Sequence, residues 1–105
     1  MLRLDESYNG REIALTVGQE FEVVLPENPL PHFRWRFEVN GWPVCEVLNT
    51  YFEESLRLGT SGGSRIWQFQ ARQVGSATID LVYEKRERPV VVSHRRFSLH
   101  VTVTM

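Results

Sequence analysis

The sequence predicts an all-β protein, one immunoglobulin-like antiparallel β-sandwich of about seven strands that spans residues 1–105 and has no disulfide. Three observations support this prediction. Apolar and polar residues alternate along most of the chain, which places the apolar ones on one face of successive strands. Turn-forming residues separate these runs. A chain of 105 residues, 42% of them hydrophobic, can bury one core, and its single cysteine excludes an internal disulfide.

The expected strands follow one another along the chain. The first contains Ile13, Leu15 and Val17 and ends at Gly18. Later runs place apolar residues at alternate positions: Phe21, Val23 and Leu25; Trp35, Phe37 and Val39; Trp67, Phe69 and Ala71; Ala77, Ile79, Leu81 and Tyr83; Phe97, Leu99, Val101 and Val103. The largest of these side chains should form the core, which we expect to contain Trp35, Trp67, Phe69, Leu81 and Leu99.

The segment 42–58 has the weakest pattern. Residues 44–47 are compatible with a strand, whereas residues 51–58 suggest a short helical turn or an irregular loop. No stretch of the chain has a helical period of adequate length, so this segment does not change the predicted fold class.

Charge and hydropathy argue against two classes of partner. The chain has 12 basic and 13 acidic residues, whereas a nucleic-acid-binding domain usually has a basic surplus. No apolar run approaches the roughly 18 residues that cross a membrane. Residues 1–60 contain 10 acids and 5 bases, and residues 61–105 contain 3 acids and 7 bases. This asymmetry favours salt bridges between strands, although arginines also suit a partner surface.

The first residues do not form a secretory signal peptide, because Met1 to Glu6 are too few and too charged. The chain as written is therefore expected in the cytoplasm. A periplasmic or secreted protein whose leader has been removed is equally compatible with the sequence, which leaves the compartment open.

No set of residues predicts catalysis, a metal site or a cofactor. The three histidines, His32, His94 and His100, have no spacing that nominates a triad or a metal site, although His100 and Asp80 could face each other across strands. Cys45 is expected to be a small buried side chain. The Gly-rich segment 59–65 lacks the lysine of a phosphate-binding loop. We therefore expect a protein that is not an enzyme.

Three connections have unusual composition. Residues 27–33 contain two prolines and should be stiff, which lowers the entropy lost on binding. Residues 59–63 contain three glycines, which permit positive φ and a close approach of another backbone. Residues 85–89 form a charged turn after Tyr83. Alternate loops of a Greek-key sandwich gather at one end, so these three could form one binding edge.

At these connections the sequence resembles the chagasin family, whose members inhibit papain-like cysteine peptidases. The family pattern is Asn-Pro-Thr-Thr-Gly-aromatic followed by Trp, then Gly-x-Gly-Gly, then Arg-Pro-aromatic. The resemblance covers about residues 11–105. The matching peptidase-binding positions here are Asn28, Pro29, Leu30, Pro31, His32 and Phe33, before Trp35; Gly59, Thr60, Ser61, Gly62 and Gly63; and Arg88, Pro89 and Val90.

The resemblance implies an inhibitor that acts reversibly and without being cleaved, and we expect a monomer, although the sequence does not fix the oligomeric state. In the family, the Asn-Pro loop enters the active-site cleft over the catalytic cysteine, the Gly-rich loop lies on the non-primed side, and the Arg-Pro loop packs on the primed side. The implied partner is a papain-like cysteine peptidase, with no nucleic acid and no membrane insertion. The alternative is a non-inhibitory sandwich module that binds another protein or a carbohydrate through degenerate inhibitor loops.

This chain departs from the family pattern at three places. Leu30, Pro31 and His32 stand where the family has Thr-Thr-Gly, and Val90 replaces the aromatic residue. Thr60 stands at the first glycine of the Gly-rich motif, unless Gly59 serves as that glycine with one inserted residue. The scaffold therefore matches the family better than the contact residues do. If inhibition is retained, the first loop should insert into the cleft with Leu30 as its tip. The alternative is that Leu30 turns inward and caps the core of the sandwich.

Overall fold

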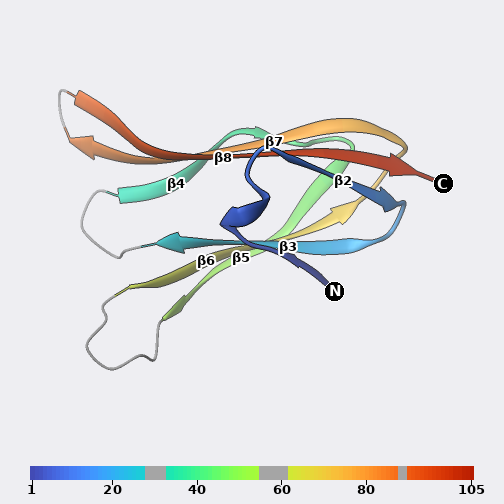
Figure 1. Ribbon diagram of the computed structural model, residues 1–105, viewed down its shortest axis with the longest axis horizontal. Coiled ribbons are helices and arrows are strands. Elements are labelled where there is room, and N and C mark those ends of the chain that lie inside the picture. The colour runs from blue at the N-terminus through green and yellow to red at the C-terminus, as the bar shows by residue number, and fades with distance from the viewer. Residues whose placement is uncertain (28–32, 55–61, 88–89) are drawn as a thin grey trace.

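Two four-stranded sheets pack face to face in the computed structural model and form a sandwich (Figure 1). The structure describes residues 1–27, 33–54, 62–87 and 90–105. In chain order the elements are β1 (Leu2–Leu4), the 3₁₀ helix η1 (Glu6–Tyr8), β2 (Arg11–Thr16), β3 (Glu20–Glu27), β4 (Phe33–Asn40), β5 (Cys45–Glu54), β6 (Gly63–Ala71), β7 (Gly75–Glu87) and β8 (Val90–Thr104). The predicted all-β sandwich is confirmed, and the described residues form eight strands where about seven were expected.

The first sheet has the strand order β1-β3-β6-β5, and its inner face follows the predicted alternation. Phe21, Val23 and Leu25 of β3 are at most 1% exposed. Phe21 lies opposite Phe69 of β6, and the two rings stack with centroids 4.9 Å apart. These apolar positions point between the sheets because side chains alternate faces along a strand.

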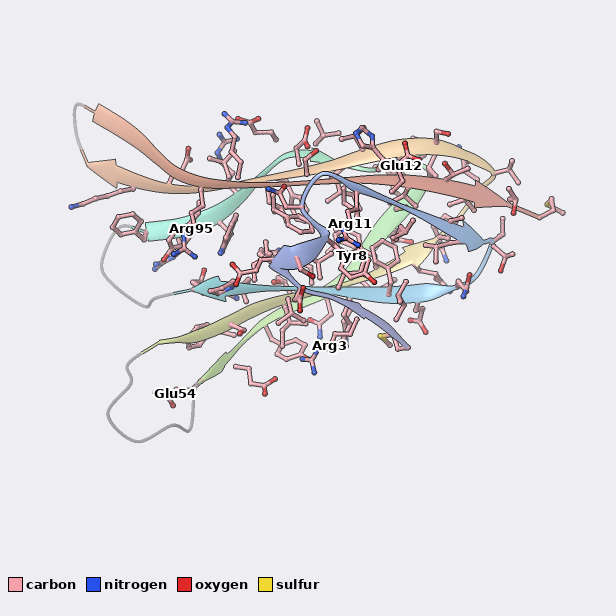
Figure 2. The ribbon with its side chains drawn as sticks, viewed as in Figure 1. Arg3, Tyr8, Arg11, Glu12, Glu54 and Arg95 are labelled. Atoms are coloured by element: carbon pink, nitrogen blue, oxygen red, sulfur yellow. The ribbon has the colours of Figure 1, made fainter. Side chains whose placement is uncertain are left out.

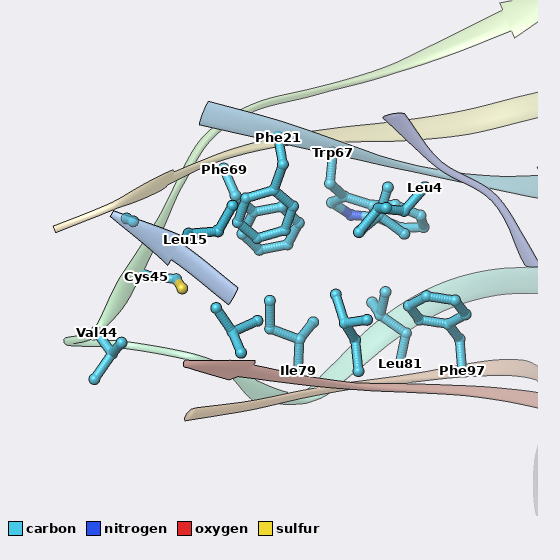
Figure 3. Close-up of a cluster of buried hydrophobic side chains, with 14 of the residues drawn as sticks. Leu4, Leu15, Phe21, Val44, Cys45, Trp67, Phe69, Ile79, Leu81 and Phe97 are labelled. Atoms are coloured by element: carbon cyan, nitrogen blue, oxygen red, sulfur yellow. The ribbon is translucent and has the colours of Figure 1, made fainter. Parts of the chain in front are cut away.

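The second sheet has the order β2-β8-β7-β4 and supplies the other half of the core. Its central strands β7 and β8 are the longest, with 13 and 15 residues. Figure 3 shows Ile79, Leu81 and Phe97 from this sheet facing Phe21, Phe69 and Trp67 from the other. Four of the five predicted core residues are buried, namely Trp67, Phe69, Leu81 and Leu99, whereas Trp35 is half-buried and packs against the cluster.

The N-terminal segment crosses from one sheet to the other, which the sequence did not indicate. β1 pairs with β3 and β2 pairs with β8, both in parallel, so the sandwich is antiparallel except at these edges. The helix η1 makes the crossing, and its first turn is capped by Asp5, which accepts a hydrogen bond from the Ser7 amide. Next to it, Asn9 Oδ1 accepts a 2.8 Å hydrogen bond from the Ser98 amide of β8.

Two β-bulges account for differences from the predicted pattern. The register of β4 shifts between Phe37 and Val39, and Val39 is 46% exposed although it continues the apolar alternation. The register of β5 shifts between Val47 and Asn49. The expectation of a helical turn or irregular loop in residues 51–58 is wrong for residues 51–54, which belong to β5. Residues 55–58 lie outside the described residues. Among the described residues, no helix is long and apolar enough to span a membrane.

Candidate functional site

The first connection runs from β3 to β4, the second from β5 to β6 and the third from β7 to β8. The strand ends that bound these three connections lie at the same end of the sandwich, which we call the loop end (Figure 1). In the first sheet, Glu27 at the end of β3 and Glu54 at the end of β5 both lie opposite Gly63 at the start of β6. In the second sheet, Phe33 at the start of β4 lies opposite Lys85 of β7, and Glu87 lies opposite Val90 at the tip of the β7–β8 hairpin. Figure 2 labels Glu54 at this end.

Most of the predicted peptidase-binding residues lie outside the described residues. These are Asn28, Pro29, Leu30, Pro31 and His32 of the first connection, Gly59, Thr60 and Ser61 of the second, and Arg88 and Pro89 of the third. Phe33, Gly62 and Gly63 are described in full, and Val90 is described as the first residue of β8. Whether the loop residues form one binding edge remains a prediction. The ends of the strands that carry them are described.

Residues on either side of the first connection join the two sheets. Trp35 of β4 donates a 3.0 Å hydrogen bond from its indole Nε1 to the carbonyl oxygen of Pro26 of β3. Its ring also contacts Trp67 edge-on, with centroids 6.2 Å apart. The same side chain therefore packs against the core and holds the strand that leads into the connection. A buried or half-buried tryptophan usually finds such a partner for its N–H.

The return from the first connection is fixed by aromatic packing. The Phe33 ring stacks on Tyr83 of β7 with centroids 5.3 Å apart. The Lys85 ammonium lies 5.8 Å from the centroid of the Phe33 ring, within range of a cation–π interaction. Phe33, predicted from the sequence as a site residue, is thus anchored to the scaffold through its side chain.

Glycine at the start of β6 is required by the fold itself. Gly62 has φ +118°, a conformation that side-chain-bearing residues rarely adopt. A Cβ on Gly63 would overlap the Glu53 carbonyl oxygen and would lie 2.9 Å from Phe52 Cζ. The predicted close approach is present, and at Gly63 the approaching backbone is that of the neighbouring strand β5.

A buried ion pair stands at the base of the first and second connections. Glu27 is 6% exposed, its Oε2 accepts a 3.2 Å hydrogen bond from Arg65 Nε, and Arg65 Nη2 lies 3.1 Å from the same oxygen. The Arg65 guanidinium also lies over the Phe52 ring, 5.8 Å from its centroid. Sequence analysis missed this pair. The sequence did contain a signal for it in the alternation of buried positions. Glu27 falls at the next buried position of β3 after Leu25, and Arg65 falls two residues before the buried Trp67 of β6.

A second buried carboxylate lies near the third connection. Glu84 of β7 is 3% exposed and accepts a 2.8 Å hydrogen bond from Arg36 Nε. This hydrogen bond and the Glu84 charge raise the pKa of Arg36 above its ordinary value. The register of the β7–β8 hairpin shifts between Tyr83 and Glu84, and such a bulge bends a hairpin and increases its twist. The expectation of a charged turn at residues 85–89 is wrong for residues 85–87, which continue β7, and residues 88–89 lie outside the described residues.

The remaining candidates have structural explanations. Cys45 is fully buried, and burial raises the pKa of its thiol to about 11, so the thiol is poorly suited to act as a nucleophile. His100 lies opposite Thr78, whose hydroxyl is 3.3 Å from His100 Nδ1, while Asp80 lies opposite Ser98. The suggested pairing of His100 with Asp80 is therefore wrong. In the part of the chain that the structure describes, no group of three or more metal-binding side chains is present.

Comparisons with known proteins identify similar chains. Residues 14–101 match the family described as Chagasin family peptidase inhibitor I42. Chagasin of Trypanosoma cruzi is 27% identical over 86 residues, which cover 77% of this chain and 78% of that protein. A solved cysteine protease inhibitor of Entamoeba histolytica superposes with a TM-score of 0.81 at 16% identity, covering 98% and 94% of the two chains.

A third similarity is to a protein solved in a complex. The structure described as PbICP-C in complex with falcipain-2 superposes with a TM-score of 0.60 at 14% identity, covering 97% of this chain and 89% of that one. At this identity the similarity concerns the fold.

Proposed function

The chain belongs to the chagasin family of peptidase inhibitors, and on this premise we propose that it inhibits papain-like cysteine peptidases by placing its loop end over the active-site cleft. The expected interface is of standard size, roughly 1,600 Å² in total. Inhibition is reversible and leaves the inhibitor uncleaved. The protein acts by occlusion and performs no catalysis of its own.

The observation that carries this proposal is the common position of the three pairs of strand ends. The three connections with unusual composition start from one end of a two-sheet core, next to the anchored residues Trp35, Phe33 and Gly63. Binding residues are often held on loops by a rigid scaffold, which limits the entropy lost when the partner binds.

Each connection has its own proposed role. The first inserts into the cleft, with Leu30 between Pro29 and Pro31 as the apolar tip that meets the catalytic centre. The second, from Gly59 to Gly63, offers backbone groups on the non-primed side of the cleft. The third packs on the primed side, where Val90 gives a smaller contact than the aromatic residue typical of the family. These assignments follow from the match of motifs.

The test is a titration of papain and of a cathepsin-like enzyme with the protein, using a fluorogenic substrate. A second protein reverts Leu30, Pro31 and His32 to Thr-Thr-Gly. If these three departures weaken binding, reversion restores two or three hydrogen bonds of about 0.5–1.5 kcal/mol each and lowers the inhibition constant about 10- to 100-fold. Val74→Asp, a change at an exposed position between β6 and β7, is the control and should leave inhibition unchanged.

The outcomes separate inhibition from the alternative function. If neither protein inhibits at high micromolar concentration while both remain folded, the proposed function is wrong and a binding module with degenerate inhibitor loops is favoured. If the original protein inhibits tightly and reversion changes nothing, inhibition stands and the affinity comes from the other two connections.

A further inference from the structure

The Glu27–Arg65 ion pair occupies an unusual place in the sandwich. Glu27 is the last residue of β3 and is the residue with which the first connection begins. Arg65 is the third residue of β6, the strand that follows the second connection. Both continue the inward-facing positions of their strands, one step beyond Leu25 and Trp67. The pair therefore lies where the apolar core ends and the loop end begins.

The contacts of Arg65 extend the pair to a third strand. Its guanidinium donates a hydrogen bond to Glu27 of β3 through Nε and forms an ion pair with the same carboxylate through Nη2. It also lies over the ring of Phe52, which is its register partner on β5. Phe52 is two residues before the end of β5, where the second connection begins. One cation thus links the strand end entering the first connection with both strand ends of the second.

Stability of the core does not explain this arrangement. The Glu27 side chain is 5% exposed and that of Arg65 is 27% exposed, so the charges lose much of their hydration on folding. Apolar side chains of similar volume often stabilise a protein as well as a buried ion pair or better. What an ion pair adds is direction, because its hydrogen bonds are satisfied in only one relative position of the strands.

We propose that the Glu27–Arg65 pair is a positioning clamp, which fixes the first and second connections relative to each other for binding to the peptidase. This inference rests on the proposed function, because a positioning role requires that both connections contact the partner. Without the clamp, the strand ends have more than one accessible arrangement and only a fraction is competent to bind. The apparent affinity then falls by that fraction.

The main test replaces the pair by apolar side chains of similar size, Glu27→Met with Arg65→Met. We expect a melting temperature equal to or above that of the original protein and an inhibition constant for papain about tenfold higher. If the pair served stability alone, a variant with an unchanged melting temperature would also keep its inhibition constant. Glu27→Gln, which keeps the shape and removes the charge, is the second variant and should also weaken inhibition.

A matched control uses an ion pair between β5 and the residue after β6 at the opposite end of the sandwich. Arg72 Nε lies 2.8 Å from Glu46 Oε2, and Glu46 is opposite Gln70, far along the ladder from Gly63. The control variant Glu46→Met with Arg72→Met likewise removes one negative and one positive charge. It should leave the inhibition constant within about twofold of the original.

A second readout keeps this inference distinct from the proposed function. Amide hydrogen exchange of the free proteins should be faster in the clamp variant at the described ends of β3, β5 and β6, and unchanged where Cys45 pairs with Ala71. If the original protein inhibits and the clamp variant inhibits equally well, the positioning role is refuted. If the original protein does not inhibit, the proposed function fails, and the exchange decides on the clamp: unchanged exchange at these strand ends refutes it and faster exchange supports it.

Discussion

Replacement of Gly63 by alanine tests whether the loop end depends on the close approach of β5 and β6. A Cβ at this position would overlap the Glu53 carbonyl oxygen and crowd the Phe52 ring at 2.9 Å. Gly63 also pairs with Glu27 on one side and with Glu54 on the other. The added methyl group can therefore be accommodated only if β5 moves away from β6 where the second connection begins.

The expected cost follows from the overlap with backbone rather than with a flexible side chain. Overpacking of this kind costs about 1–3 kcal/mol. For a domain of this size, each kcal/mol lowers the melting temperature by about 4–8 °C, so we expect a decrease of roughly 5–20 °C. Because the displaced strand ends carry the second connection, the inhibition constant for papain should rise about tenfold or more.

The assays are thermal unfolding followed by circular dichroism and titration of papain below the unfolding temperature. Gly10→Ala is the control, because Gly10 has φ +81° and a Cβ added there would meet no atom within 4 Å. The left-handed conformation alone costs alanine about 1–2 kcal/mol, so the control also loses stability. It should keep full inhibition. An unchanged melting temperature in Gly63→Ala, or an equal effect of both variants on inhibition, would refute the reasoning.

Three further predictions concern the core, the thiol and the first connection. Trp67 is 4% exposed, so Trp67→Ala should lower the free energy of unfolding by about 3–5 kcal/mol in chemical denaturation; a loss below about 1 kcal/mol would contradict its place in the core. The pKa of the Cys45 thiol is raised to about 11 by burial, so a thiol reagent at about pH 8 should label it only after denaturation. The unfolded chain loses this proton near pH 9, so stability should fall between about pH 9 and 11, and this decrease should be absent in Cys45→Ala. Trp35→Phe removes the hydrogen bond to Pro26, which should cost about 1 kcal/mol of stability and weaken inhibition severalfold; unchanged inhibition would show that the bond does not position the first connection.

The period-two pattern predicted the core because most strands keep one phase from end to end. Phe21, Val23 and Leu25 were assigned to the buried face from sequence and are at most 1% exposed. The pattern failed where a bulge changes the phase. In β5, Val47 lies opposite Phe69 before the bulge, and Thr50 lies opposite Trp67 after it. Paired residues point to the same face of the sheet, so the inward side chains of β5 have odd residue numbers before the bulge and even residue numbers after it. The alternation in residues 51–54 therefore did not predict a strand.

Other features could not be predicted because they depend on contacts between distant parts of the chain. Leu2–Leu4 is too short to show a period, and it becomes a strand because β3 offers an edge for pairing. Glu27 and Arg65 are each typical of surface residues when considered alone. Only the antiparallel register of β3 and β6, which is not encoded locally, brings them together.

The positions of the buried carboxylates suggest a division of roles within the sandwich. Among the residues that the structure describes, Glu27 and Glu84 are the two buried charged residues, and each lies near a strand end from which a connection with unusual composition leaves. Apolar packing stabilises the sheets but is not directional, whereas an arginine–carboxylate pair fixes a relative orientation. If the loop residues bind the peptidase as proposed, we expect substitutions in the connections to leave the packing of Leu25 and Trp67 unchanged. The Leu-Pro-His sequence at residues 30–32 should then replace Thr-Thr-Gly at little cost in stability, so that the predicted contact residues can diverge while the two-sheet core is kept.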